Sequence, residues 1–232
     1  MIVYLDFFNI YIMGVIEMSF QFYFLVKILK KKLWSPFYFL FAVCTVIVND
    51  FLPSGTIMGF VVLVFLLTVC GTFVCHADAK PSFLYAALTT EIMLLCYGIT
   101  HSLMSLAAPF LPAAFHDMAG IAFMLASQAV ALLLTGCCYY MVYRYFSDYS
   151  TAEMQQMFLV FIPILMIFIM SRYVNMMQFE FQYALGVEEE ISEYLFSHWQ
   201  LLAMHLLGLA SLFCILFFFK KLQQNFRLST EL

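Results

Sequence analysis

Residues Trp199–Phe219 read WQLLAMHLLGLASLFCILFFF, and Lys220 and Lys221 follow at once. The run contains no Asp, Glu, Lys or Arg. A helix needs about 20 predominantly apolar residues to cross a hydrocarbon core of about 30 Å, and this run has that length. The stretch therefore predicts a transmembrane helix that ends at a pair of lysines.

The rest of the chain has the same character. Of its 232 residues, 65% are hydrophobic and only 10% are charged. A soluble domain carries about 45–50% apolar and about 25% charged residues, and one of this size could not bury so much apolar surface. The apolar runs are continuous and do not alternate with polar residues, which argues against barrel strands. Lipid is therefore expected to solvate most of the chain.

The predicted fold class is all-α, a polytopic membrane bundle of about seven transmembrane helices. Turn-forming residues such as Ser35-Pro36 and Lys80-Pro81 separate the apolar runs. The predicted spans are Ile2–Val26, Phe37–Leu52, Thr56–Cys75, Ser82–Leu106, Met118–Tyr143, Met157–Met177 and Trp199–Phe219.

Basic residues give the orientation, because lysine and arginine accumulate in short cytoplasmic loops. Seven spans place nine of the ten basic residues on one side and leave only Arg172 inside a span. The nine are Lys27, Lys30, Lys31, Lys32, Lys80, Arg144, Lys220, Lys221 and Arg227. We therefore predict a multi-pass protein of the cell membrane with its N-terminus outside and its C-terminus in the cytoplasm.

Two segments outside the spans are long enough to matter. Residues Gln178–His198 combine acidic side chains with apolar ones at helical spacing, which is typical of an interfacial helix or of a solvated acidic cap. Residues Lys220–Leu232 contain no Gly or Pro, so the last span is expected to continue as a helix. The predicted organisation is a sensor bundle over residues 1–219 and the start of a cytoplasmic signalling helix over residues 220–232.

Several polar residues of four different spans fall near one depth. Three ionisable ones lie about 8–9 Å below the outer surface, at about 1.5 Å per residue. Ionisable side chains in a span tend to face the bundle interior or a water-filled cavity. One interpretation is an outward-open ligand pocket, and the other is isolated polar residues that hydrogen-bond between helices. The candidate ligand-binding residues are Asp50, His101, Arg172, Asn175 and His205.

Two carboxyl side chains, Glu17 and Glu91, are expected deeper, in the inner half of the membrane. Lone carboxyls there are protonated or paired, because desolvation disfavours the charged form. They could form a proton relay, but neutral glutamic acids that hold helices together by hydrogen bonds are the simpler interpretation.

No enzyme motif is present. The sequence lacks HExxH, GxSxG, a P-loop and a glycine-rich nucleotide loop. None of the seven cysteines forms a CxxC pair or falls in a predicted external loop. We therefore expect no catalytic residue, no cofactor, no metal site and, because no long basic run occurs, no nucleic-acid partner.

Three stretches resemble the N-terminal membrane sensor module of Agr and GHKL-type bacterial histidine kinases that sense peptide pheromones. They are CCYYMVYRYF at Cys137–Phe146, FIPILMIFIM at Phe161–Met170 and FCILFFFKKL at Phe213–Leu222. In that family the last span runs into a cytoplasmic helix, a phospho-acceptor histidine helix and an ATP-binding domain. The catalytic half has no counterpart in these 232 residues.

The resemblance implies a receptor module of a two-component system that detects an extracellular peptide or another small amphipathic ligand. Its expected partners are the lipid bilayer, that ligand and a second copy in a homodimer. The alternative is a small seven-helix transporter or permease, which the same topology would also suit.

The seven-span topology predicts which positions a membrane-impermeant thiol reagent reaches in intact cells. In a cysteine-free background, cysteines at Ser54, Pro112 and Glu189 should be labelled from outside. Cysteines at Ala79 and Ser150 should be labelled only after the membrane is permeabilised. Labelling of this second pair in intact cells would contradict the topology.

Overall fold

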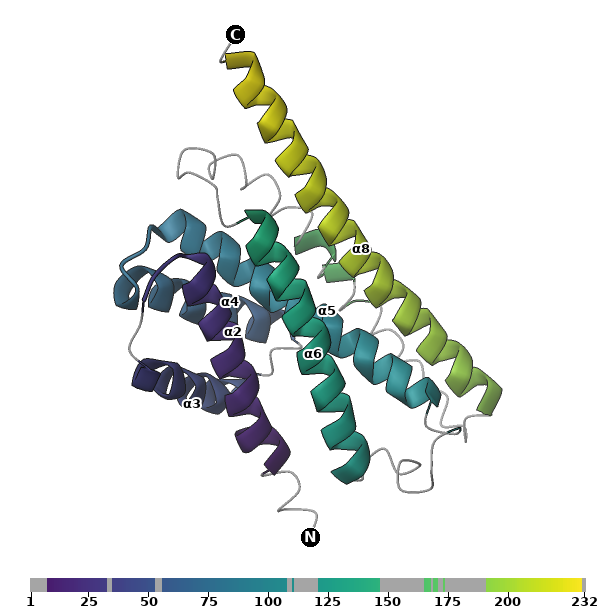
Figure 1. Cartoon of the computed structure of the whole chain (residues 1–232). Helices are drawn as coiled ribbons and strands as arrows, with labels where there is room; N and C mark the ends of the chain where they lie inside the picture. Colours follow the sequence, from purple (N-terminus) through teal and green to yellow (C-terminus); the bar gives the residue numbers. More distant parts are fainter. Residues whose placement is uncertain are drawn as a thin grey trace.

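The computed structural model describes residues 8–32, 35–52, 56–107, 110, 121–146, 165–167, 169–170, 173 and 191–230 (Figure 1). The regular elements of this described part are all helical. Two are π-helical, η1 at Phe8–Met13 and η2 at Cys70–Val74. The α-helices are α2 (Gly14–Ile28), α3 (Ser35–Phe51), α4 (Ile57–Val69), α5 (Ala79–Ala107), α6 (Ile121–Phe146) and α8 (Ile191–Thr230).

The helices confirm the predicted fold class, a helical membrane bundle. Five segments are long and apolar enough to cross a membrane: Tyr11–Ile28, Ile57–Val74, Ala79–Ala107, Ala122–Tyr145 and His198–Phe218. A shorter apolar helix at Pro36–Val48 corresponds to the predicted second span. Most of the predicted sixth span, Met157–Met177, lies outside the described residues, so the count of seven remains a prediction.

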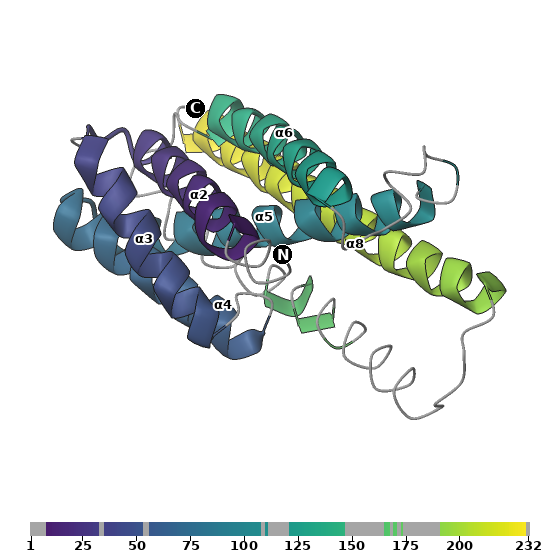
Figure 2. The same cartoon turned by 90° about the horizontal axis from the view of Figure 1, so that it is seen from below.

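Helix α5 forms the centre of the bundle. In the 18-residue window of each helix that fits a membrane span, 78% of the residues are buried in α5, against 44% in α2 and 28% in both α6 and α8. Figure 2 shows α5 between α3 and α4 on one side and α8 on the other. Pro81 is tolerated near the start of α5 because amide groups in the first helical turn have no partner within the helix.

Three of the basic residues make contacts between helix ends or between a helix end and a loop. The Lys27 ammonium lies 5.0 Å from the centre of the Tyr143 ring, which joins the ends of α2 and α6. The Lys31 ammonium donates to the His76 carbonyl, which precedes α5. Lys220 of α8 lies 4.8 Å from the Tyr145 ring centre. These contacts agree with a common side for these three residues, and the assignment of that side to the cytoplasm stays a prediction.

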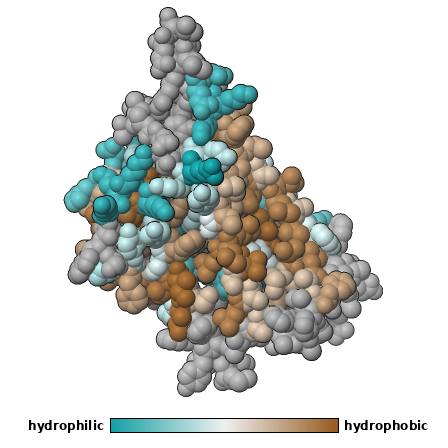
Figure 3. Space-filling model, in the orientation of Figure 1, coloured by the Kyte–Doolittle hydropathy of each residue, from teal (hydrophilic) through white to brown (hydrophobic). Residues whose placement is uncertain are grey.

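The outer surface of the described bundle is strongly apolar. Large side chains such as Phe51, Phe73 and Leu133 expose more than two thirds of their surface, at 79%, 72% and 72%. In Figure 3 hydrophobic residues cover the middle of the visible face, and hydrophilic residues gather mainly toward the upper left. Exposed apolar area of this extent is typical of contact with lipid.

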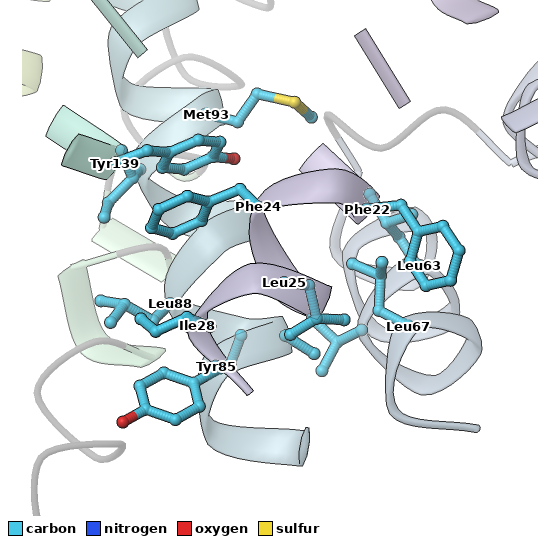
Figure 4. Packing of buried hydrophobic residues seen from close by; sticks show 14 of the residues in the cluster. Phe22, Phe24, Leu25, Ile28, Leu63, Leu67, Tyr85, Leu88, Met93 and Tyr139 are labelled. Carbon is cyan, nitrogen blue, oxygen red and sulfur yellow. The ribbon is translucent and has the colours of Figure 1, made fainter. Parts of the chain in front are cut away.

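Aromatic stacking holds α2 against its neighbours. Phe24 stacks on Tyr139 of α6 with ring centres 4.2 Å apart, and Phe22 stacks on Phe41 of α3 at the same separation. Figure 4 shows Phe22 and Leu25 near side chains of α4, with the Phe24–Tyr139 stack at the other side of α2. Offset aromatic pairs contribute about 0.5–1.5 kcal/mol beyond their area burial.

Helix α8 is one continuous element of 40 residues, about 60 Å long at about 1.5 Å per residue. It includes the predicted last span and also the second half of the predicted interfacial segment. It continues past Phe219 through Thr230, as the absence of Gly and Pro predicts. In Figure 1 its C-terminal part extends well beyond the ends of the other helices.

The Tyr139 hydroxyl provides a direct test of the α5–α6 contact. It is buried and donates to the Thr89 carbonyl at 2.8 Å. Tyr139→Phe keeps the stack on Phe24 but removes this hydrogen bond, so we expect a loss of about 0.6–2 kcal/mol of stability in a lipid-like environment. The matched control is Tyr140→Phe, because Tyr140 is 60% exposed. Equal unfolding midpoints in detergent for the two variants would contradict this role.

Candidate functional site

Two groups of three polar or small residues in α5 are seven positions apart, so corresponding members lie on the same face of the helix. Thr89, Thr90 and Glu91 are followed by Cys96, Tyr97 and Gly98 in the same order. Consecutive residues of a helix point in different directions, so the three pairs face different neighbours. Helix α5 therefore presents polar or small residues to α6, to α2 and to α8 at once.

The face toward α6 carries two contacts. The Thr89 carbonyl accepts the Tyr139 hydroxyl, and the Cys96 thiol lies 3.8 Å from the Cys138 thiol. Both cysteines are free thiols and are buried. Backbone, hydroxyl and thiol groups thus link α5 to α6 inside the apolar region.

The face toward α2 carries a buried hydrogen-bond chain. Gln21 Nε2 donates to Thr90 Oγ1 at 2.7 Å, and Thr90 Oγ1 donates to the Ala86 carbonyl at 2.8 Å. One turn before Gln21 on α2, the Glu17 carboxyl lies beside the Tyr97 hydroxyl. This face brings together oxygen-bearing side chains near the middle of both helices.

On the face toward α8, each of the two helices packs a large side chain against a glycine of the other helix. A β-carbon added to Gly98 would overlap the His205 ring. A β-carbon added to Gly208 would lie 3.1 Å from Leu95 Cδ2. Each helix therefore carries a large residue followed three positions later by a glycine, and each large residue packs over the other helix's glycine. Small residues at such contacts let membrane helices approach closely.

The His205 ring has a defined orientation at this crossing. The side chain is only 3% exposed, and its Nδ1 lies 2.7 Å from the Leu201 carbonyl on the preceding turn of α8. Because a carbonyl only accepts, Nδ1 carries the hydrogen, and in a neutral imidazole Nε2 is then the acceptor. The ring is fixed by its own helix on one side and by Gly98 on the other.

The structure brings together some of the predicted pocket residues. His101 follows Gly98 by one turn and is exposed, and it lies within electrostatic range of His198 of α8. His101 and His205 are therefore both at the α5–α8 crossing, His101 on its exposed rim and His205 within it. Arg172 and Asn175 lie outside the described residues.

Asp50 lies elsewhere. It is exposed near the end of α3 and accepts a hydrogen bond of 2.9 Å from the Tyr11 hydroxyl. Helix α3 packs mainly on α2, whereas α8 packs on α5, and Figure 2 shows α3 and α8 on opposite sides of α5. The structure thus does not place Asp50 beside the two histidines, and a pocket common to all five residues remains a prediction.

The part of the site that sequence reasoning missed is the pair of glycines. Gly98 and Gly208 carry no chemistry, and only their position relative to Leu95 and His205 gives them a role. The signal present in the sequence was a large residue followed by a glycine three positions later in two separate spans. That spacing becomes informative only once the two helices are known to be neighbours.

The chemistry available at this crossing is binding and conformational change. Within the described ranges, no three His, Cys, Asp or Glu side chains are grouped to hold a metal ion. Comparison with known proteins adds no assignment, because no protein-family model, curated protein or solved structure matches the chain.

The contact between Gly98 and His205 predicts a specific pattern of stabilities. Gly98→Ala should destabilise the protein by about 1–3 kcal/mol, because overlap with the His205 ring outweighs the gain in helix propensity of about 1 kcal/mol. His205→Ala removes the ring, so Gly98→Ala should cost little in that background. Thermal unfolding in detergent would measure the four combinations.

The matched control is Gly136→Ala in α6, where an added β-carbon would lie 3.3 Å from the end of the Phe20 ring. This contact is tight but can relax by a small movement of one side chain. Additive effects of Gly98→Ala and His205→Ala would mean that the two residues do not interact.

Proposed function

We propose that this chain is the membrane-embedded sensor module of a bacterial two-component signalling system, with α8 as its output element. The observation that carries the proposal is the continuity of α8, which runs as one helix from Ile191 to Thr230. A helix of about 60 Å is about twice the thickness of the hydrocarbon core. One continuous helix therefore reaches from the predicted outer surface to the predicted cytoplasmic side.

The packing of α8 suits an element that moves. Its main neighbour among the described helices is α5, and the contact is made through the Gly98 and Gly208 notches. Ridges that fit into such notches have discrete alternative positions, one helical turn apart. A ligand shifts the balance between two such positions only if its affinity for them differs.

The predicted outer end of the crossing supplies groups that such a ligand could contact. His101 of α5 is exposed there, and His198 of α8 is its neighbour. A ligand held by both helices would bind differently when α8 shifts relative to α5. A small amphipathic molecule or peptide fits this environment, because it offers polar groups to imidazoles and apolar groups to the surrounding side chains.

The inner end of α8 is positioned by Lys220, whose ammonium packs on the Tyr145 ring of α6. Cation–π contacts contribute about 0.5–1 kcal/mol at exposed sites, so this one would be exchanged easily for lipid headgroups. In a homodimer, two such helices would leave the membrane side by side and present the following residues to each other.

The alternative function is a small transporter or permease. It is favoured by the buried polar groups around α5, including Glu91, which is fully buried. Flux of a substrate across proteoliposomes that contain only this chain would support a transporter and count against the receptor.

The receptor proposal predicts that output depends on the helical phase of α8. Leu232 is fused to the cytoplasmic core of a histidine kinase, and one to four alanines are inserted after Phe226. Because each residue rotates a helix by about 100°, one or two alanines should change kinase activity strongly, and four should restore it in large part. Autophosphorylation in isolated membranes is the measurement.

The matched control inserts the same number of glycines, which should uncouple the kinase at every length because glycine weakens the helix. In the fusion without insertions, Gly98→Ala should alter basal activity, and His205→Ala should suppress that change. If kinase activity depended neither on the number of inserted alanines nor on Gly98→Ala, α8 would act only as a membrane anchor. That result would overturn the proposal.

A further inference from the structure

The interface between α2 and α5 contains an amide oxygen with no hydrogen-bond donor. Gln21 is fully buried, and among the described residues its Oε1 accepts no hydrogen bond. Leaving a buried acceptor without a donor costs about 1–3 kcal/mol. No donor of the described residues is placed to satisfy this oxygen.

The orientation of this amide follows from its partner. The Thr90 hydroxyl has one hydrogen, and it is donated to the Ala86 carbonyl at 2.8 Å. With this hydrogen on the Ala86 carbonyl, Thr90 is the acceptor toward Gln21, and the atom at 2.7 Å is the amide nitrogen. In this arrangement a flipped amide would place two acceptors against each other. The oxygen of Gln21 is thus held away from Thr90 by the chemistry of the chain.

Two other oxygen-bearing side chains belong to the same pair of helix faces, and one of them, the Tyr97 hydroxyl, is also buried without a hydrogen-bond partner among the described residues. Glu17 precedes Gln21 by one turn on the same face of α2, and the Tyr97 hydroxyl lies beside its carboxyl. Tyr97 in turn shares the α5 face of Thr90. The described lysines and arginines fall toward the predicted cytoplasmic ends, and Lys27 is ten residues, about 15 Å, farther along α2 than Glu17.

We propose that Glu17, Gln21 and Tyr97 form a binding site for a sodium ion between α2 and α5. Carboxylate, amide and hydroxyl oxygens are the ligands that hard cations prefer. The set contains one acidic side chain, so a monovalent ion leaves the site neutral. A divalent ion would leave an uncompensated positive charge in an apolar interior, which is strongly unfavourable. The absence of His or Cys from the set disfavours a transition metal.

Sodium binding would also satisfy the side chains that form the site. It provides the unsatisfied Gln21 oxygen with a partner and allows Glu17 to be ionised without a basic residue beside it. The Thr90–Gln21 hydrogen bond is the positioning element, because it fixes the direction of the amide oxygen. This inference does not depend on whether the chain is a receptor or a transporter.

Modification of Glu17 by a hydrophobic carbodiimide tests the site. Dicyclohexylcarbodiimide reacts with protonated carboxyls in the membrane, and a bound sodium ion would exclude both the proton and the reagent. The full chain in liposomes is treated at equal ionic strength in sodium, potassium or choline chloride, and mass spectrometry quantifies the adduct on Glu17. Sodium should lower the labelling severalfold, and potassium and choline should not.

Variants assign the ligands. Gln21→Leu and Thr90→Val should each leave Glu17 labelled in choline, which reports an intact bundle, and should abolish the protection by sodium. Glu91→Gln is the matched control, because Glu91 lies on the face of α5 that Gly98 shares, and it should keep full protection. Labelling of Glu17 that does not respond to sodium would overturn the site. Protection that survives in both Gln21→Leu and Thr90→Val would overturn the assignment of its ligands.

Discussion

The burial of α5 is the constraint on which the rest of the structure depends. This helix carries Thr89, Thr90, Glu91 and Tyr97 through the middle of a membrane bundle. Each polar group left in hydrocarbon would cost several kcal/mol, so such a helix must be surrounded by protein. Helix α5 is accordingly the most buried of the five membrane-length helices, and α2, α4, α6 and α8 are arranged around it.

The neighbours of α5 show how a helix of mixed polarity is packed. At two oxygens of α5 the neighbouring helix supplies a donor: Tyr139 donates to the Thr89 carbonyl and Gln21 donates to Thr90. Where α5 offers no side chain, at Gly98, the partner supplies a large ring. Each contact is worth only about 0.6–2 kcal/mol, so the arrangement depends on several of them acting together.

The sequence predicted five of the seven spans in agreement with the structure, because the membrane sets the length of an apolar helix. The predicted span Ser82–Leu106, for example, lies within α5 at Ala79–Ala107. Helix rotation was not predictable, because uniform apolar runs carry no periodic signal. His101 and His205 were expected at equal depth, yet one is exposed and the other is buried against Gly98. Depth follows from counting residues, whereas direction follows from which helices are neighbours.

The two proposed sites are linked because they use adjacent residues of one helix. Tyr97 belongs to the sodium site and Gly98 to the contact with α8, and consecutive helical residues lie about 100° apart. A small rotation of α5 that tightens the oxygen cluster around an ion would also move the notch that holds His205. Sodium binding would then favour one position of α8 over the other, and by thermodynamic reciprocity the position of α8 would change the affinity for sodium by the same factor. This coupling would pass through α5 itself and would need no direct contact between the two sites.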